Sequence, residues 1–247
     1  MKGLIRMRLD KYLCDIGKGT RKDVKKLIKS GAVSVNGSAV CDPSKNFDEN
    51  TCVVSINGKE VKYEKYIYLM MNKPKGYISA TDDKYQKTVL CLLDEKYRFF
   101  DLFPAGRLDI DTEGFLLLTN DGAFAHEILS PKKHVAKTYY AHVSGKMDEN
   151  HIKAFSEGIT FDGYKAKSAK LKIIKSGLNG DDGIYSEIEL TIYEGKFHQV
   201  KKMFEAAGSE VLYLKRIAMG NLFLDSSLEK GQVKKLTKED IEKIKEK

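Results

Sequence analysis

The sequence predicts an α+β protein in two parts: a small basic module, then a larger domain with a mixed, largely antiparallel sheet. Its net charge of +8 is concentrated at one end, because residues 1–31 alone carry +7. That end has two helical patterns followed by hairpin signals, whereas alternating apolar residues typical of strands dominate the remainder. With 42% hydrophobic and 32% charged residues, the composition excludes disordered and collagen-like chains.

The first elements are two short helices and two hairpins. Residues 8–16 carry apolar side chains at helical spacing, and Thr20 is a suitable N-cap for a second helix that ends at Gly31. The apolar stripe of this second helix consists of Val24, Leu27 and Ile28, and most of its other positions are basic. Asn36-Gly37 and Asn57-Gly58 each separate apolar residues in alternation, which predicts tight hairpin turns.

A charged, aperiodic stretch then predicts a domain boundary near residue 65. Residues 66–71 are apolar on both faces and predict a central strand. Further strands are predicted around 139–143, 171–173 and 188–192, with a hairpin loop at 179–183. Two clear helices are predicted, over 196–207 and after a capping box formed by Thr237 and Asp240.

The densest group of reactive side chains lies in residues 105–122. If residues 108–111 are extended, Asp109 and Asp111 point to the same side. Two such carboxylates can serve acid–base chemistry, bind Mg²⁺ or cap turns, and spacing alone favours turn capping. No histidine or third carboxylate stands nearby at a ligand spacing, and the four cysteines form no C-x-x-C pair, so we predict no metal site.

The N-terminal elements resemble the S4 RNA-binding domain over residues 7–63. The resemblance is carried by R-L-D-K-Y-L and by R-K-D-V-K-K-L-I-K-S-G-A-V-S-V-N-G. It implies that the face of the two helices holds structured RNA through its phosphate backbone, with Arg8, Arg21, Lys22 and Lys25 as contacts. Basic side chains are suited to this task, because they neutralise phosphates and displace counterions.

Residues 66–247 resemble the catalytic domain of pseudouridine synthases of the RsuA/RluB type, whose members carry an S4 domain in front. The most specific stretch is G-R-L-D-I-D-T-E-G-F-L-L-L-T-N-D-G, at residues 106–122. Supporting segments are 71–83, 134–140 and 194–204. The first and last of these resemble the form typical of enzymes that modify small-subunit (16S) rRNA.

The resemblance implies three catalytic residues. Asp109 matches the catalytic aspartate, which either attacks the sugar or removes its C2′ proton. Tyr139 matches the active-site tyrosine that stacks on the target base, although on its own it is a typical core residue of a strand. Lys201 matches the basic partner of the aspartate, where many pseudouridine synthases have arginine. Because the reaction is redox-neutral and free of hydrolysis, no cofactor is expected.

Three further residues are expected to touch the RNA around this site. Arg107 could help to extrude the base or hold a phosphate, or instead pair locally with Asp111 or Glu113. Lys73 is expected to line the RNA path, and His198 to contact RNA or to serve the structure.

The function implied is the conversion of uridine to pseudouridine in 16S rRNA, either naked or in a ribosome-assembly intermediate. The alternatives are a 23S rRNA enzyme of the same family, a non-catalytic S4-type assembly protein and, more remotely, a Mg²⁺-dependent nuclease. No apolar run reaches the roughly 18 residues of a membrane span, and the N-terminus lacks the apolar core of a signal peptide. We therefore expect a cytoplasmic monomer that binds RNA and no membrane.

Overall fold

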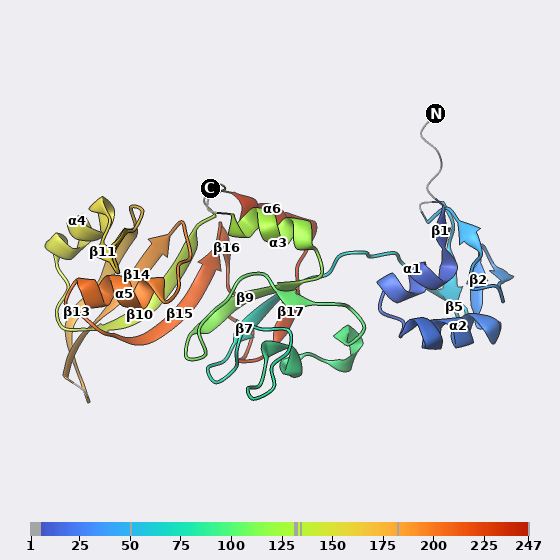
Figure 1. Ribbon diagram of the computed structural model, residues 1–247, viewed down its shortest axis with the longest axis horizontal. Coiled ribbons are helices and arrows are strands. Elements are labelled where there is room, and N and C mark those ends of the chain that lie inside the picture. The colour runs from blue at the N-terminus through green and yellow to red at the C-terminus, as the bar shows by residue number, and fades with distance from the viewer. Residues whose placement is uncertain (1–5, 50, 131–132, 134, 182, 247) are drawn as a thin grey trace. The chain divides into compact units, whose positions relative to one another are not determined.

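The computed structural model describes residues 6–49, 51–130, 133, 135–181 and 183–246. The chain forms two units (Figure 1). The first comprises the residues up to Ile67 together with Leu93–Leu102, and the second comprises Tyr68–Leu92 and Phe103–Lys247. No helix within the described residues is long and apolar enough to cross a membrane.

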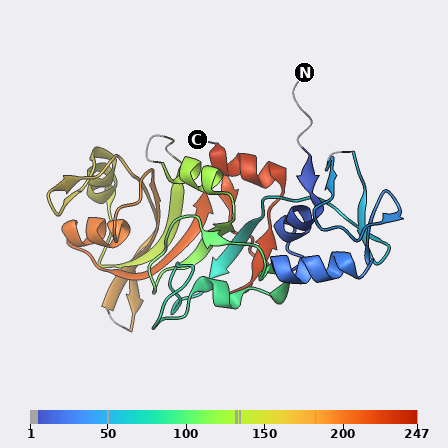
Figure 2. The same cartoon turned by 45° about the vertical axis from the view of Figure 1, so that its right-hand side comes forward.

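Among its described residues the N-terminal unit has two α-helices and a small sheet. The helices are shown in blue in Figures 1 and 2. Its elements are β1 (Met7–Arg8), α1 (Leu9–Asp15), α2 (Arg21–Lys29), β2 (Val33–Val35), β3 (Ser38–Ala39), β4 (Asn46–Phe47), β5 (Val54–Ile56), β6 (Lys59–Val61) and the 3₁₀ helix η2 (Glu95–Tyr97). The sheet order is β3-β2-β5-β6, and β1 pairs with β4. Both predicted hairpins are confirmed, and Asn36 and Asn57 adopt the positive φ that such turns require.

The sequence of α2 explains both its start and its orientation. Thr20 accepts a hydrogen bond from the Asp23 backbone N–H, and the Asp23 carboxylate accepts one from the Thr20 backbone, which confirms the predicted cap. Val24 and Ile28 are fully buried in one core with residues of α1. The basic positions between them therefore remain on the exposed side of the helix.

The second unit is built on a mixed, mostly antiparallel sheet, as predicted. Its strands are β7 (Tyr68–Lys73), β8 (Phe103–Pro104), β9 (Glu113–Thr119), β10 (Lys137–Ser144), β13 (Lys170–Gly180), β14 (Gly183–Ile192), β15 (Val211–Met219), β16 (Leu222–Phe223) and β17 (Val233–Lys235), with the order β13-β14-β10-β15-β9-β7-β17. The β15–β9 pair is parallel, and the other strand pairs recorded in this sheet among the described residues are antiparallel. A two-stranded ribbon, β11 (Thr160–Phe161) and β12 (Tyr164–Lys165), lies outside it.

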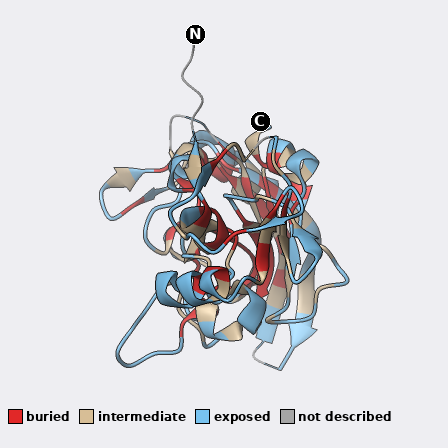
Figure 3. Ribbon diagram, turned by 90° about the vertical axis from the view of Figure 1, so that its right-hand side faces the viewer, coloured by how far each residue is buried: buried red, intermediate tan, exposed pale blue. Residues whose placement is uncertain are grey.

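Four α-helices and one 3₁₀ helix complete the described part of this unit. They are η1 (Val89–Leu92), α3 (Gly122–Leu129), α4 (Glu149–Glu157), α5 (Gln199–Ala206) and α6 (Lys238–Lys245). The cap predicted at Thr237 is confirmed, because its side chain accepts a hydrogen bond from the Asp240 backbone N–H. Asp121 caps α3 in the same way, by accepting a hydrogen bond from the Phe124 backbone N–H. Helices α3 and α6 bury Phe124, Ile128 and Ile244 against β7 and β9, and Figure 3 shows how the buried residues gather along the strands.

Three local predictions differ from the structure. The strand predicted from residue 66 begins at Tyr68, and the helix predicted from residue 196 begins at Gln199. His198 has φ of 52°, a left-handed conformation that no α-helix continues, so the chain turns there first. Residues 108–111 are not extended, because the Thr112 N–H donates to the Asp109 carbonyl and closes a turn.

Candidate active site

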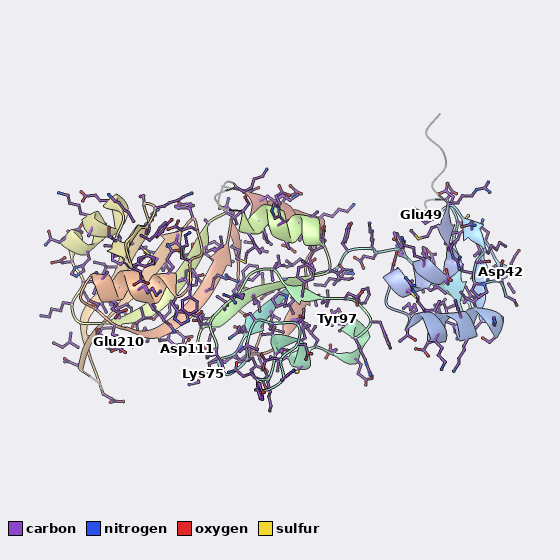
Figure 4. All side chains as sticks on the ribbon, in the orientation of Figure 1. Asp42, Glu49, Lys75, Tyr97, Asp111 and Glu210 are labelled. Atoms are coloured by element: carbon purple, nitrogen blue, oxygen red, sulfur yellow. The ribbon has the colours of Figure 1, made fainter. Side chains whose placement is uncertain are left out.

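A tight turn at residues 109–112 presents the two aspartates at the N-terminal end of β9. Gly114 follows it with φ of +98°, and a Cβ there would lie 2.2 Å from the Arg216 carbonyl oxygen. Glycine is therefore required for β9 to lie beside β15 immediately after the turn. On the other side, the Gly76 N–H donates to the Ile110 carbonyl at 2.7 Å; Figure 4 labels Lys75 and Asp111 on these two neighbouring loops.

Lys73 holds this turn from inside the protein. Its side chain is fully buried, and Nζ donates to the carbonyl oxygens of Pro74 at 3.1 Å, Asp109 at 3.0 Å and Thr112 at 2.9 Å. Burial lowers the pKa of Lys73 to about 8, although the nearby carboxylates of Asp111 and Asp109 favour its charged form. The expectation that Lys73 lines the RNA path is therefore wrong, because its ammonium group is buried and donates its hydrogen bonds to backbone carbonyls.

The carboxylate of Asp109 lies between the side chains of His198 and Lys201. His198 Nε2 lies 3.4 Å from Asp109 Oδ1, and Lys201 Nζ lies 3.8 Å from Asp109 Oδ2. Lys201 is closer to Asp111, with 2.7 Å and 2.6 Å from Nζ to the two carboxylate oxygens. The expected Lys201–Asp109 pair is thus the longer of two contacts that one lysine makes.

The two aspartates are not equivalent. Burial acts to raise the pKa of Asp111, but the hydrogen bond and the charge of Lys201 outweigh burial and lower it. The side chain of Asp111 is 61% exposed, whereas that of Asp109 is 28% exposed. Asp109 therefore faces a more enclosed space, and Asp111 keeps Lys201 beside it.

That space is a pocket of about 450 Å³ in the second unit. It is lined by residues 106–109 and 194–201, Thr112, Leu129, Lys137, Tyr139, Tyr164, Lys167, Ile192, Leu214 and Arg216. Tyr139, on β10, is 8% exposed and lies directly across from Arg216 on β15. The structure thus brings together five of the expected site residues: Arg107, Asp109, Tyr139, His198 and Lys201.

The wall formed by residues 194–201 is fixed by a buried carboxylate. Glu194 accepts hydrogen bonds from the Tyr164 hydroxyl at 2.7 Å, the Lys167 N–H at 3.1 Å and the Gln199 side chain at 2.7 Å. These bonds connect the β11–β12 ribbon to the start of α5. His198 and Lys201 consequently reach Asp109 from a fixed backbone.

Sequence reasoning missed three pocket residues. Phe197 is 64% exposed and stacks on His198 with ring centroids 3.8 Å apart, while Lys202 Nζ lies 5.2 Å from the Phe197 ring centroid. Lys137 and Arg216 are buried in the pocket wall. The only signal for Phe197 is an aromatic residue beside a basic one, which is common at RNA-binding surfaces, and the other two gave no signal because they lie inside strands.

Arg107 is exposed at the pocket. Among the described residues Arg107 does not form the local ion pair with Asp111 or Glu113 that was the alternative to an RNA contact. Asp111 pairs with Lys201 instead, and Glu113 pairs with Lys230. Within the described part of the chain, no three His, Cys, Asp or Glu side chains converge as the ligands of a metal ion would.

The basic residues expected to bind RNA from the first unit form a separate group. Arg21, Lys22 and Lys25 are exposed on α2. Arg8 is exposed too, but its guanidinium is held by Asp10, with Nη2 2.7 Å and Nε 3.0 Å from the two carboxylate oxygens. The 134–140 segment begins at His134, which lies outside the described residues; Lys137 and Tyr139 of this segment are described above.

Comparison with known proteins agrees with these observations. The model of the RNA pseudouridylate synthase family matches residues 67–206, and that of the S4 domain matches residues 7–51. An uncharacterized RNA pseudouridine synthase of Bacillus subtilis, YtzG, is 48% identical over 241 residues, covering 97% of this chain and 99% of that protein. The ribosomal small subunit pseudouridine synthase A of Vibrio cholerae is 38% identical over 96% of this chain and 99% of its own length.

Two further relatives matter for the assignment. The ribosomal large subunit pseudouridine synthase B of Bacillus subtilis is 36% identical over 96% of this chain and 95% of its own length. A crystal structure of a pseudouridylate synthase matches with a TM-score of 0.66 and 36% identity, covering 96% of this chain and 99% of the other. The chain therefore belongs to the RsuA/RluB-type family of RNA pseudouridine synthases, with an S4 RNA-binding domain at its N-terminus.

Proposed function

We propose that this pseudouridine synthase acts on one uridine of 16S rRNA, and that Asp109, Tyr139 and Lys201 carry the reaction. The observation that supports it most is the meeting of these three side chains in one pocket, although they come from a turn, a strand and a helix far apart in the sequence. The forms of residues 71–83 and 194–204, and similarity to a protein named for the small subunit, favour 16S over 23S rRNA.

In the proposed reaction the target uridine leaves the RNA helix and enters the pocket. Asp109 acts on the ribose, either by attacking C1′ or by removing the C2′ proton, while the N1–C1′ bond breaks. The base turns, C5 bonds to C1′, and Tyr139 helps to remove the C5 proton. Lys201 and His198 hold the Asp109 carboxylate with their positive or hydrogen-bonding groups. Atoms and electrons balance without a redox partner or water, so the reaction requires no cofactor.

The exposed cations of α2 are proposed to hold the RNA backbone. Arg21, Lys22 and Lys25 present mobile charges to phosphates, which suits affinity without sequence readout. Because Arg8 already engages Asp10, an RNA contact of Arg8 requires a phosphate to share or displace that pair.

We test the substrate by mapping pseudouridines in rRNA from cells with and without the protein, using carbodiimide-dependent reverse-transcription stops. We expect one 16S stop to disappear and to return with the wild-type gene but not with Asp109→Ala. A lost 23S stop would correct the substrate and keep the chemistry. If every rRNA stop remains in cells without the protein, an RNA-binding assembly protein or a substrate outside rRNA would be favoured.

Purified protein tests the residue assignment. Asp109→Ala should lower single-turnover conversion by more than about 10⁴-fold, since enzymatic accelerations of 10⁶ or more depend on such groups. Its RNA affinity should stay nearly unchanged, and full turnover would contradict the assignment. Comparing naked 16S rRNA with partly assembled small subunits in the same assay identifies the form of the substrate.

We also propose that the protein works as a cytoplasmic monomer, because Asp109, Tyr139 and Lys201 meet within one chain and a cofactor-free site of this kind needs no partner. Light scattering coupled to size-exclusion chromatography should give the mass of one chain, 27.9 kDa. Cell fractionation should place the protein with the soluble and ribosomal fractions.

A further inference from the structure

Two buried cations in the pocket wall have no acidic partner among the residues that the structure describes. Lys137 is 7% exposed, and its Nζ donates to the Val135 carbonyl at 3.1 Å. Arg216 is 2% exposed, and its Nε donates to the Phe115 carbonyl at 2.7 Å. Arg216 Nη2 is buried and has no hydrogen-bond partner among the described residues, and neither side chain forms an ion pair with a described carboxylate.

The sheet places these two cations beside Tyr139. Lys137 and Tyr139 are two residues apart on β10, so their side chains point to the same face. Arg216 lies directly across from Tyr139 on β15, and all three line the pocket that contains Asp109. Burial and, to a lesser extent, the charge of Arg216 together lower the pKa of Lys137 to about 8. The two cations are therefore close enough to repel each other.

Such an arrangement costs stability unless something negative binds between the cations. The acids of the pocket do not fill this role, because Asp109 faces His198 and Lys201, and Glu194 is held by Tyr164 and Gln199. The part of an extruded nucleotide that enters a pocket most deeply is its base, whereas the phosphates stay with the RNA backbone outside. The missing negative charge should therefore belong to the base.

We propose that Lys137 and Arg216 form a cationic floor that binds the uracil ring as an anion while it is detached from the ribose. This inference rests on the proposed assignment of the pocket as the active site. When the N1–C1′ bond breaks, its electron pair leaves with N1, and the uracil carries one negative charge spread over its ring nitrogens and carbonyl oxygens. Lys137 Nζ and Arg216 Nη2 donate to those atoms.

The remaining steps balance this charge. C5 of the anion bonds to C1′ and displaces Asp109 as a carboxylate, or it adds to C1′ of the glycal while C2′ takes back the proton that Asp109 had removed. C5 then loses its proton on the Tyr139 side, N1 gains one, and no charge remains on the base. Because charge attraction is not directional, the two cations retain the ring while it turns.

The leaving group tests this role. In 5-fluorouridine the fluorine stabilises the detached anion, so its departure depends less on protein cations. Lys137→Met should slow single-turnover consumption of target uridine by about 100-fold, a typical effect of removing a charge-stabilising donor. With 5-fluorouridine at the same site, the factor by which Lys137→Met slows the reaction should be about tenfold smaller. Nucleoside mass spectrometry after nuclease digestion measures the rates with uridine and with 5-fluorouridine. Arg216→Gln should show the same two effects as Lys137→Met.

The matched control is Lys215→Met, the neighbour of Arg216 on β15 whose side chain points to the other face. It should leave both rates unchanged. Equal losses on both substrates for Lys137→Met and Arg216→Gln would show a merely structural role and overturn the inference. Activity of Asp109→Ala would instead overturn the proposed active site, so the two failures are distinguishable.

A binding measurement on the wild-type protein covers the case in which these variants do not fold. Barbiturate is a planar pyrimidine that is anionic at neutral pH, and uracil is its neutral counterpart. In NMR titrations of the methyl groups around the pocket, barbiturate should bind at least about tenfold more tightly than uracil. Equal affinity for the two rings would overturn the inference.

Discussion

The two units of this protein use positive charge in opposite ways. On α2, Arg21, Lys22 and Lys25 point into solvent from a helix whose other face is a hydrophobic core. In the second unit, Lys73, Lys137 and Arg216 are buried and donate to backbone carbonyls. Exposed cations are screened and largely interchangeable, whereas buried cations are fixed in place and strongly coupled to their surroundings.

This difference separates holding RNA from acting on it. A phosphate backbone is an extended target that several mobile cations can share, so no single exposed lysine should be essential. A reacting sugar and base require groups held within a fraction of an ångström.

Apart from loss of Asp109 itself, the largest effect is expected from Lys73→Met. Without Nζ, the carbonyls of Pro74, Asp109 and Thr112 lose their donor, and the turn that carries Asp109 loses its position. Unfolding free energy should fall by about 1–3 kcal/mol, and turnover by about 100-fold because the reacting group is misplaced. Urea unfolding and single-turnover assays measure these changes. Lys75→Met, on the same loop but exposed, should change neither, and wild-type behaviour of Lys73→Met would disprove the positioning role.

Lys201→Met should have the next largest effect. It removes the charge beside Asp109 and Asp111, so turnover should fall by about 10–100-fold while RNA affinity and stability change little. Asp111→Asn should lower turnover less than Lys201→Met does, because Lys201 can then move closer to Asp109. Rate constants that match the wild type in Lys201→Met would rule out a catalytic pairing.

Buried lysines should make stability depend on pH. The pKa of Lys73 and of Lys137 is about 8 in the folded protein, against 10.5 for an unperturbed lysine. Between these values the unfolded chain binds more protons than the folded one, so stability rises with pH by up to about 1.4 kcal/mol per unit for each lysine. Urea unfolding of wild type and Lys73→Met at pH 8 and pH 10 isolates the effect, because other groups cancel in the difference. A wild-type slope no steeper than that of the variant would contradict these shifted values.

The smallest effect is expected from the exposed cations. Replacing Arg21, Lys22 and Lys25 together by glutamine should weaken RNA binding by about tenfold at moderate salt and flatten its salt dependence by up to about one unit of slope per lost phosphate contact. Stability should stay within about 0.5 kcal/mol. Lys59→Gln with Lys62→Gln removes charge from the same unit outside α2 and serves as the control. An unchanged slope in the triple variant would show that this face does not meet RNA.

Much of the fold was predictable because its determinants are local. Thr20 with Asp23 and Thr237 with Asp240 are capping pairs within one turn, and two Asn-Gly pairs define the tight hairpins. Alternating apolar residues along β10 mark its buried face. The family motifs identified Asp109, Tyr139 and Lys201 as residues of one site, and the pocket brings them together.

Only the tertiary structure decided how the charged residues are used. A lysine in sequence looks the same whether it reaches solvent or the interior. Lys73 can be buried because carbonyls 36 and 39 residues away accept its hydrogen bonds. For the same reason the position of Lys137 and Arg216 in the pocket could not be predicted, because their neighbours come from adjacent strands. The closer pairing of Lys201 with Asp111 could not be predicted either, because it spans 90 residues. Periodicity and caps record short-range interactions, whereas the electrostatics of a site depend on groups that meet only after folding.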